Sequence, residues 1–269
     1  MTPKNAVIYP STNTDMSLAV KPVVAGRSMY YAYQRGTDFF QIGELIPNSY
    51  TDAQYYSQGV TDHIPLYAQG VCSSMVASST NNMAMFASGR NEVLVNQFLW
   101  AGDERPQMSF HKWTFPYRVV GLSFLQEYGI IFMYNAGTIY MVTLNTQLNS
   151  LSTKPVPYLD LYNYSNVVDG VGKIPANMPQ GDLVAIIYDN ANLRHKEVQI
   201  TNVDWSTRTF NCHYNGQVAI GYRFHSTFTL TPPFIKDEQG RVTAGPKTRI
   251  QSIRMTFRDT GRVRYRPVS

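Results

Sequence analysis

The chain has 269 residues, of which 13% are aromatic and only 15% are charged, and its formal net charge is +5. This length is sufficient for one large or two ordinary domains with hydrophobic cores. No apolar run approaches the roughly 18–20 residues that cross a bilayer, and the N-terminus lacks a basic region followed by an apolar core. We therefore expect no membrane-spanning segment and no signal peptide, and a protein that is made in a cytoplasm and stays soluble or assembles there.

The first part of the chain reads as a series of short strands. Low charge together with abundant Tyr, Thr, Asn, Ser and Val favours an all-β protein with extensive surfaces that meet other subunits. No window has the periodicity of an amphipathic helix. A polar, tyrosine-bearing loop is expected over residues 47–62. Apolar runs separated by turn residues predict a strand pair or one buried strand over residues 21–33. Further strands are predicted over residues 39–46, 71–77, 83–87, 92–100, 119–125, 129–134 and 138–144, with an aromatic hairpin over 98–115.

This spacing of about ten residues, with turn signals between the runs, is typical of a propeller, sandwich or barrel. We interpret residues 1–147 as a propeller-like array of short antiparallel strands. The segment 148–181, which contains several Pro and Gly residues, is the best candidate for a boundary.

The remainder of the chain also reads as β-structure. Residues 182–188 predict a buried strand, residues 197–203 and 208–214 a hairpin, and residues 218–230 a further strand. We therefore interpret residues 148–269 as a C-terminal β-sandwich or β-barrel domain.

The last part of the chain carries the basic charge. From Arg241 onward the sequence has eight basic residues and one acidic residue, Asp259. Residues 248–258 and 262–266 alternate apolar and basic side chains on either side of a short Asp-Thr-Gly turn, which predicts an antiparallel hairpin. One face is a ladder of arginines, and like charges at this spacing repel. We expect this face to meet another subunit or DNA, with a solvated strand face as the alternative; the candidates are Arg249, Arg254, Arg258, Arg262, Arg264 and Arg266.

The sequence predicts no enzyme, no metal site and no cofactor. The histidines lack the spacing of metal ligands, and there is neither a phosphate-binding loop nor the Gly-x-Ser-x-Gly motif of hydrolases. Cys72 and Cys212 are interpreted as buried free thiols, with a disulfide as the alternative. The carboxylate pairs, Asp103 with Glu104 and Asp237 with Glu238, are adjacent in turns and read as solvated acids rather than a glycosidase pair.

Aromatic residues allow two further hypotheses. Trp100, Trp113 and Tyr117 could stack on a sugar ring, although a place in a core or a subunit interface is the favoured interpretation. The arginine face, with Tyr222, Phe224 and Tyr265 nearby in the sequence, could also suggest binding of single-stranded nucleic acid, where aromatic rings stack on bases. The aromatic residues and most arginines fall on opposite strand faces, however, so only a non-specific electrostatic role with duplex DNA is retained.

Several short motifs, in the same order, resemble a known family. The C-terminal motifs are residues 223–228 before 232–237, then 249–251 and 257–261. Those in the first part are residues 21–26, 33–36 and 63–67, and Trp100 with residues 112–115. Together they resemble the tail nozzle protein (tail tubular protein B) family of T7-like short-tailed bacteriophages, over nearly the whole chain. The similarity is to the C-terminal portion of a family whose members usually have a further N-terminal part, so we expect a fragment, a split gene product or a reduced version.

The resemblance implies a structural role in the virion. It implies a homo-oligomeric ring, expected to be a hexamer, which lies below a tail adaptor similar to tail tubular protein A, conducts DNA during genome ejection and helps to anchor tail fibres. Contact with viral double-stranded DNA would be transient and non-specific, and assembly would take place in the host cytoplasm. The alternatives are a carbohydrate-binding or glycan-degrading β-propeller at the virion tip and, third, a DNA-binding β module.

Overall fold

The computed structural model describes residues 16–47, 55–102, 104–145, 157, 159–189 and 196–227. The chain divides into two compact units, Met1–Leu151 and Ser152–Ser269, called here the first and second unit. The predicted all-β fold is confirmed: the described residues form small antiparallel sheets, with no helix and no sheet closed into a barrel among them. From the sequence we expected the limit between two domains to lie between residues 147 and 148. Independent folding of each unit as a domain stays a prediction.

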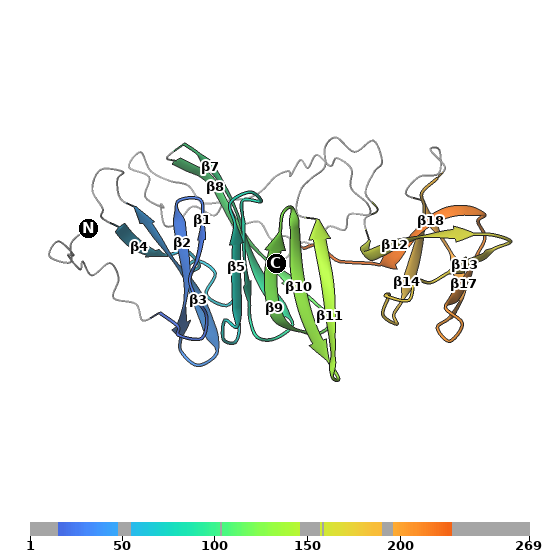
Figure 1. Cartoon of the computed structure of the whole chain (residues 1–269), viewed down its shortest axis with the longest axis horizontal. Helices are drawn as coiled ribbons and strands as arrows, with labels where there is room; N and C mark the ends of the chain where they lie inside the picture. The colour runs from blue at the N-terminus through green and yellow to red at the C-terminus, as the bar shows by residue number, and fades with distance from the viewer. Residues whose placement is uncertain are drawn as a thin grey trace, which may run out of the picture. The chain divides into compact units, whose positions relative to one another are not determined.

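The first sheet is a four-stranded antiparallel meander (Figure 1). Glycines with positive φ, Gly26 and Gly36, form the tight turns that separate its first three strands. Its last strand was expected to be a loop; it is a polar edge strand paired along one side only, so it lacks the apolar alternation by which strands are recognised. The strands are β1 (Val23–Ala25), β2 (Ser28–Arg35), β3 (Phe39–Pro47) and β4 (Tyr55–Gly59).

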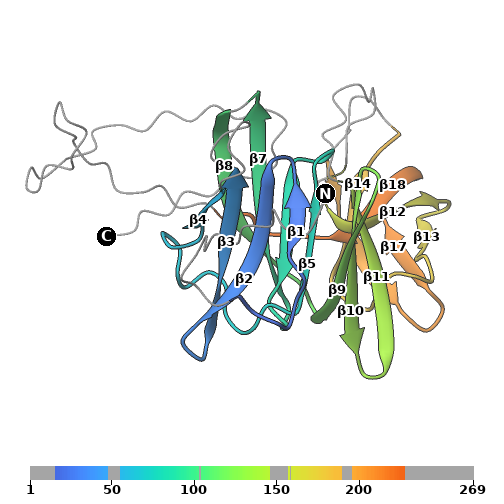
Figure 2. The ribbon, with the colours of Figure 1, turned by 60° about the vertical axis from the view of Figure 1, so that its left-hand side comes forward.

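The second and third sheets follow in chain order (Figures 1 and 2). The second sheet contains the predicted aromatic hairpin, and its strands are β5 (Ser74–Ser78), β6 (Met83–Ala87), β7 (Glu92–Ala101) and β8 (Glu104–Thr114). The third sheet is a three-stranded meander whose strands are β9 (Arg118–Leu125), β10 (Tyr128–Asn135) and β11 (Thr138–Asn145).

The second sheet lies between the other two sheets of its unit. Every residue of β6 is buried, because the strand faces a core on each side. Ala84 and Phe86 pack against residues of the first sheet such as Tyr30, whereas Met85 packs against residues of the third sheet such as Ile131. The described part of the first unit is thus built from three meander sheets packed face to face; a propeller-like arrangement stays a prediction.

The second unit contains two small sheets that share one core. Phe210 lies in this core against Gly172, where an added Cβ would lie 2.3 Å from the Phe210 Cζ atom. One sheet has the order β12 (Asp160–Val167), β18 (Gly216–Tyr222), β14 (Leu183–Ile187), β15 (Glu197–Val198). The other has the order β13 (Val171–Lys173), β17 (Thr209–Cys212), β16 (Ile200–Asp204).

The strands of the second unit differ from the sequence expectations in two places. The segment 148–181 was the boundary candidate, and the two units do divide within it, at Leu151/Ser152; its later part, however, contains the strands β12 and β13, which were not expected. The strand expected over residues 218–230 ends at Tyr222, and residues 223–227 form no strand; the rest of that range lies outside the described residues.

The turn between β16 and β17 gives a testable pKa. An Asp204 side-chain oxygen accepts hydrogen bonds from the Ser206 hydroxyl (2.6 Å), the Ser206 backbone N–H (2.8 Å) and the Thr207 backbone N–H (3.2 Å). Hydrogen bonds from Ser206 and Thr207, first of all that from the Ser206 hydroxyl, lower the pKa of Asp204 to about 2.

We therefore expect the Asp204 carboxyl to titrate with a pKa of about 2. Because the folded-state pKa is depressed, the turn is stabilised above the ordinary Asp value of about 3.9, and this stabilisation is lost as the pH falls towards 2. The measurement is the carboxyl carbon chemical shift against pH. Ser206→Ala should move the pKa upwards, and an unchanged midpoint in that variant would contradict the assignment.

Candidate assembly surfaces

The arginines predicted as interface or DNA-facing residues all lie outside the described residues, so their role stays a prediction. The same holds for His195, for Asp103, and for the acidic pair Asp237 and Glu238. The predicted arginines are Arg249, Arg254, Arg258, Arg262, Arg264 and Arg266.

The described side chains include no candidate metal centre and no reactive thiol. Within the described ranges, no group of three or more His, Cys, Asp or Glu is placed to hold a metal ion. Cys72 and Cys212 are buried free thiols, as favoured from the sequence. Burial raises the pKa of Cys72 to about 12 and also raises the pKa of Cys212. Because the thiolate is the nucleophile and the metal ligand, both cysteines act as core residues.

The aromatic hairpin contributes its rings to the cores of the first unit. Trp100 packs against the core between the first and second sheets, and Trp113 and Tyr117 pack against the core between the second and third sheets. The Tyr117 ring stacks on Tyr140, with 5.1 Å between ring centroids. The ring centroids of Trp113 and His111 are 5.5 Å apart, and burial lowers the pKa of His111. The three rings that could have stacked on a sugar, those of Trp100, Trp113 and Tyr117, therefore pack against the cores of the first unit.

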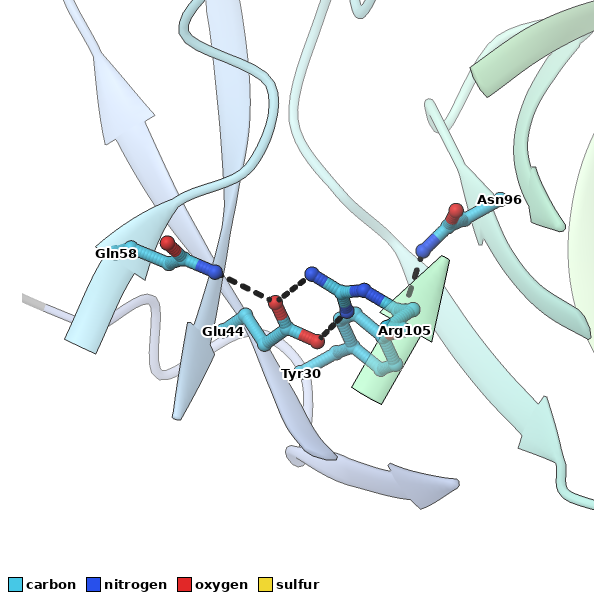
Figure 3. A network of polar contacts seen from close by, with 5 residues as sticks. All are labelled: Tyr30, Glu44, Gln58, Asn96 and Arg105. Atoms are coloured by element: carbon cyan, nitrogen blue, oxygen red, sulfur yellow. Dashed lines mark hydrogen bonds and ion pairs between the residues drawn. The ribbon is translucent and has the colours of Figure 1, made fainter. Parts of the chain in front are cut away.

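A buried polar network joins the first and second sheets (Figure 3). Tyr30, Glu44 and Gln58 lie directly opposite one another on β2, β3 and β4, so they share one face of the first sheet. The Gln58 amide donates to a carboxylate oxygen of Glu44 (3.1 Å). From β8, Arg105 binds both oxygens of the same carboxylate, with Nη2 at 2.9 Å from Oε2. From β7, the Asn96 amide donates to the Tyr30 hydroxyl (3.3 Å).

Burial makes the Glu44–Arg105 ion pair energetically important. The Glu44 side chain is 0% exposed and that of Arg105 is 12% exposed. Burial alone would lower the pKa of Arg105, but the hydrogen bond and the charge of Glu44 outweigh it and raise the pKa. The pKa of Tyr30 is also raised, first by burial and then by the charge of Glu44. The Arg105 guanidinium carbon lies 5.3 Å from the centre of the Trp100 ring, a cation–π contact. This network therefore fixes how the first and second sheets meet.

The outer face of the third sheet is apolar. Its inner face packs on the second sheet through residues such as Ile131 and Val142. On the other face, register places Tyr134 opposite Ile139 and Phe132 opposite Met141. The side chains of Ile139 and Met141 are 65% and 63% exposed. The apolar and aromatic residues of this face are Leu125, Tyr128, Ile130, Phe132, Tyr134, Ile139 and Met141; register also places Ser123, Thr143 and, at its edge, Arg118 on it.

The second unit presents a separate cluster of tyrosines. Tyr162 and Tyr164 point to solvent from β12, and the Tyr164 ring lies 4.5 Å from that of Tyr188, centroid to centroid. The pKa of Tyr164 is raised, first by burial and then by its hydrogen bond with Tyr188. The rings of Tyr162 and Tyr164 are inclined by 72°, so they form no flat platform for a sugar or a base. Exposed tyrosines are enriched where proteins meet.

The described part of the chain holds no helix with the length and apolarity that crossing a bilayer requires. No curated protein matches the sequence. A sequence model of the bacteriophage nozzle protein family matches residues 1–266, nearly the whole chain. The order of motifs noted in the sequence and the all-β sheets agree with this match. The chain therefore belongs to the bacteriophage nozzle protein family and is a structural component of a phage tail.

Proposed function

We propose that the chain is a subunit of a tail nozzle: a ring of identical copies, six in the form expected for the family, that lies below the tail adaptor and conducts DNA during genome ejection. The outside of the ring helps to anchor the tail fibres, and contact with viral double-stranded DNA is transient and non-specific. Assembly takes place in the host cytoplasm, and the role is structural rather than enzymatic. The observation that carries the proposal is the family match across residues 1–266.

The distribution of charge supports a conduit for DNA. Non-specific DNA affinity depends on the number of phosphates that Lys and Arg neutralise. The described residues contain nearly equal numbers of acidic and basic side chains, so they offer no strongly basic track that would hold DNA in place. The excess of positive charge lies in ranges outside the described residues, mainly from Arg241 onward.

The three aromatic side chains that suggested the glycan-binding alternative, Trp100, Trp113 and Tyr117, pack against cores, which argues against it. Permanent subunit interfaces are instead large, apolar and poor in charge. The apolar outer face of the third sheet and the exposed tyrosines of the second unit have that character.

The test is the mass of the purified chain by light scattering, followed by negative-stain images, with and without an adaptor protein. The expected result is a sixfold ring, formed by the chain alone or on the adaptor. A single-chain mass under both conditions would overturn the proposal.

We further expect the arginines of the predicted hairpin to act at subunit contacts more than in the bore. Replacing Arg254, Arg258 and Arg264 by serine should prevent ring assembly, because charge-paired interface residues lose their partners. Light scattering on the triple variant measures this. The control replaces Lys21, Arg35 and Lys173, three exposed basic residues in the described part of the chain, and should assemble normally. A ring that forms equally well without the hairpin arginines would refute this expectation.

A further inference from the structure

The third sheet has one strand fewer than the two sheets before it. The first and second sheets have four strands each, whereas the third has the order β11-β10-β9 and ends at β11 (Figure 1). Burial also falls towards β11. Ile131 and Met133 on β10 are 0% and 2% exposed, but Val142 on β11, which packs against the same core, is only partly buried. No described strand lies beyond β11, so this margin of the core stays partly exposed.

The backbone of β11 points every second pair of N–H and C=O groups to this open edge. Ala136 and Gly137 form a two-residue loop with positive φ between β10 and β11, and the residues that flank such a loop are hydrogen-bonded to each other. Hydrogen-bonded pairs alternate along an antiparallel ladder, so the backbone groups of Ile139, Met141 and Thr143 point away from β10. No hydrogen bond from another described residue reaches them.

The opposite edge of the same sheet shows how such outward groups are satisfied elsewhere in this unit. On β9, the Leu122 backbone N–H donates to the Ser74 hydroxyl (3.1 Å) and the Val119 backbone N–H donates to the Arg90 carbonyl (2.7 Å). The β9 edge is thus bonded to β5 and to the loop between β6 and β7. The β11 edge has no equivalent among the described residues, so it is the edge at which the sheet can be extended.

β11 also lacks the features that keep long edge strands from pairing. Edge strands are usually protected by charged residues, proline or bulges. β8 has Pro106 and charged residues such as Lys112, and β12 has an irregular register with a positive φ at Leu161. β11 has eight residues without a charge or a proline, and its register with β10 is continuous. It therefore has the character of a strand that takes a neighbour.

The C-terminal part of the chain contains a predicted strand that needs a sheet. Residues 248–258, which lie outside the described residues, alternate apolar side chains such as Ile253 and Met255 with Arg254. A two-stranded hairpin like the one predicted over 248–266 is only marginally stable alone in water. The run is longer than β11 and can pair with all of it. No other segment outside the described ranges alternates over a comparable length.

We propose that residues 248–258 pair with the open edge of β11 in the same chain, as a fourth strand of the third sheet. Their apolar side joins the inner face beside Val142, where the margin of the core is partly exposed. Their basic side then borders the apolar outer face of the sheet and places arginines at the new edge, where charged side chains oppose further pairing. The pairing lies within one chain and does not depend on the proposed ring.

The tether favours the segment of the same chain over that of a neighbouring copy. Residues 228–247 connect the predicted strand to the described part of the second unit, and when extended they span about 65–70 Å. A tethered segment has an effective concentration in the mM range, far above the concentration of a second copy in dilute solution.

Hydrogen exchange of the β11 amides, resolved to single residues by mass spectrometry, tests the pairing. In the full chain, at a dilution where it is monomeric, the amides of Ile139, Met141 and Thr143 should exchange at least about 100-fold more slowly than in an unstructured peptide. The amides of Tyr140 and Val142 bond to β10 and serve as the internal reference. Outward amides that exchange at the unstructured rate would overturn the proposal. Protection that appears only where copies associate would overturn the pairing within one chain.

Proline variants identify the segment that occupies the edge. Met255→Pro and Thr256→Pro are made separately, because the N–H groups of neighbouring residues in a strand point to opposite sides and proline removes one of them. At least one variant should return the outward amides of Ile139 and Met141 to the unstructured exchange rate and leave that of Val142 unchanged. The matched control is Thr243→Pro, in the turn-rich segment before the predicted hairpin, which should keep the protection. Outward amides that stay protected in both variants would overturn the assignment to residues 248–258.

The outcomes separate this pairing from the proposed function. A chain that forms sixfold rings while its outward β11 amides exchange freely would overturn the pairing and leave the nozzle role standing. A chain that stays at the single-chain mass, with and without an adaptor protein, but keeps these amides protected would overturn the ring and support the pairing.

Discussion

Replacing Arg105 by methionine is expected to lower the free energy of unfolding of the first unit by about 3–5 kcal/mol. The Glu44 carboxylate is fully buried and Arg105 is its bidentate partner. Without the guanidinium, the carboxylate keeps the Gln58 amide as a neutral donor but has no counter-charge, and a buried charge without a counter-charge is strongly unfavourable. The variant also loses the cation–π contact with Trp100.

The measurement is urea unfolding followed by tryptophan fluorescence. Trp205, in the second unit, is first replaced by phenylalanine so that only Trp100 and Trp113 report. The matched control is Lys112→Met, which breaks the more exposed ion pair of Lys112 with Glu92; an exposed pair contributes at most about 1 kcal/mol.

The double variant Glu44→Leu with Arg105→Met isolates the cause. It removes both charges at once. It should therefore recover much of the free energy of unfolding that Arg105→Met loses, because replacing a buried ion pair by apolar residues is often close to neutral. If Arg105→Met and Lys112→Met had equal effects, or if the double variant were no more stable than Arg105→Met, the loss would not come from the orphaned carboxylate.

The strands that could be predicted from the sequence are those whose signal is local. Residues 83–87 were expected as a strand and form β6 with the same limits, because an apolar run between turn residues is sufficient to identify a strand buried on both faces. A hairpin was expected over residues 98–115 from the aromatic residues on both arms, and it forms part of the longer β7–β8 hairpin. The strand β4 was missed because its polar side chains give no alternation, and only its pairing with β3 makes it a strand. The strand β12 was missed because it lies among the Pro and Gly residues that suggested a boundary.

The functional surfaces could be predicted far less well, because they depend on distant contacts. Glu44 and Arg105 are 61 residues apart, and nothing in either local sequence identifies the other as its partner. A single acid within the apolar run 39–46 was the one available signal, since a Glu is almost never fully buried unless it is paired. The exposed face of β11 could not be assigned either, because alternating apolar residues on both faces do not reveal which face the second sheet covers.

Phe86→Ala is expected to lower the free energy of unfolding by about 3–5 kcal/mol. Phe86 is 0% exposed on the central strand β6 and meets the Tyr30 ring edge to face, with 6.0 Å between centroids. Removing the ring leaves a cavity between the first and second sheets. The cavity can close only if β6 moves, and β6 is also packed against the third sheet on its other face. The matched control is Phe132→Ala on the outer face of the third sheet, where the ring is only half-buried; measured at a dilution where the chain is monomeric, it should cost about 1 kcal/mol.

This variant also tests whether the three sheets unfold together. Trp100 packs against the core between the first and second sheets, and Trp113 against the core between the second and third. Two parent variants are needed, one that keeps only Trp100 and one that keeps only Trp113. Phe86→Ala should lower the urea midpoint by the same amount in both, because Phe86 and Met85 belong to one strand that packs in both cores. A Trp113 midpoint that stayed at the parent value would mean that the third sheet unfolds separately. The first unit would then be a row of independent sheets, held in register chiefly by contacts such as the Glu44–Arg105 pair.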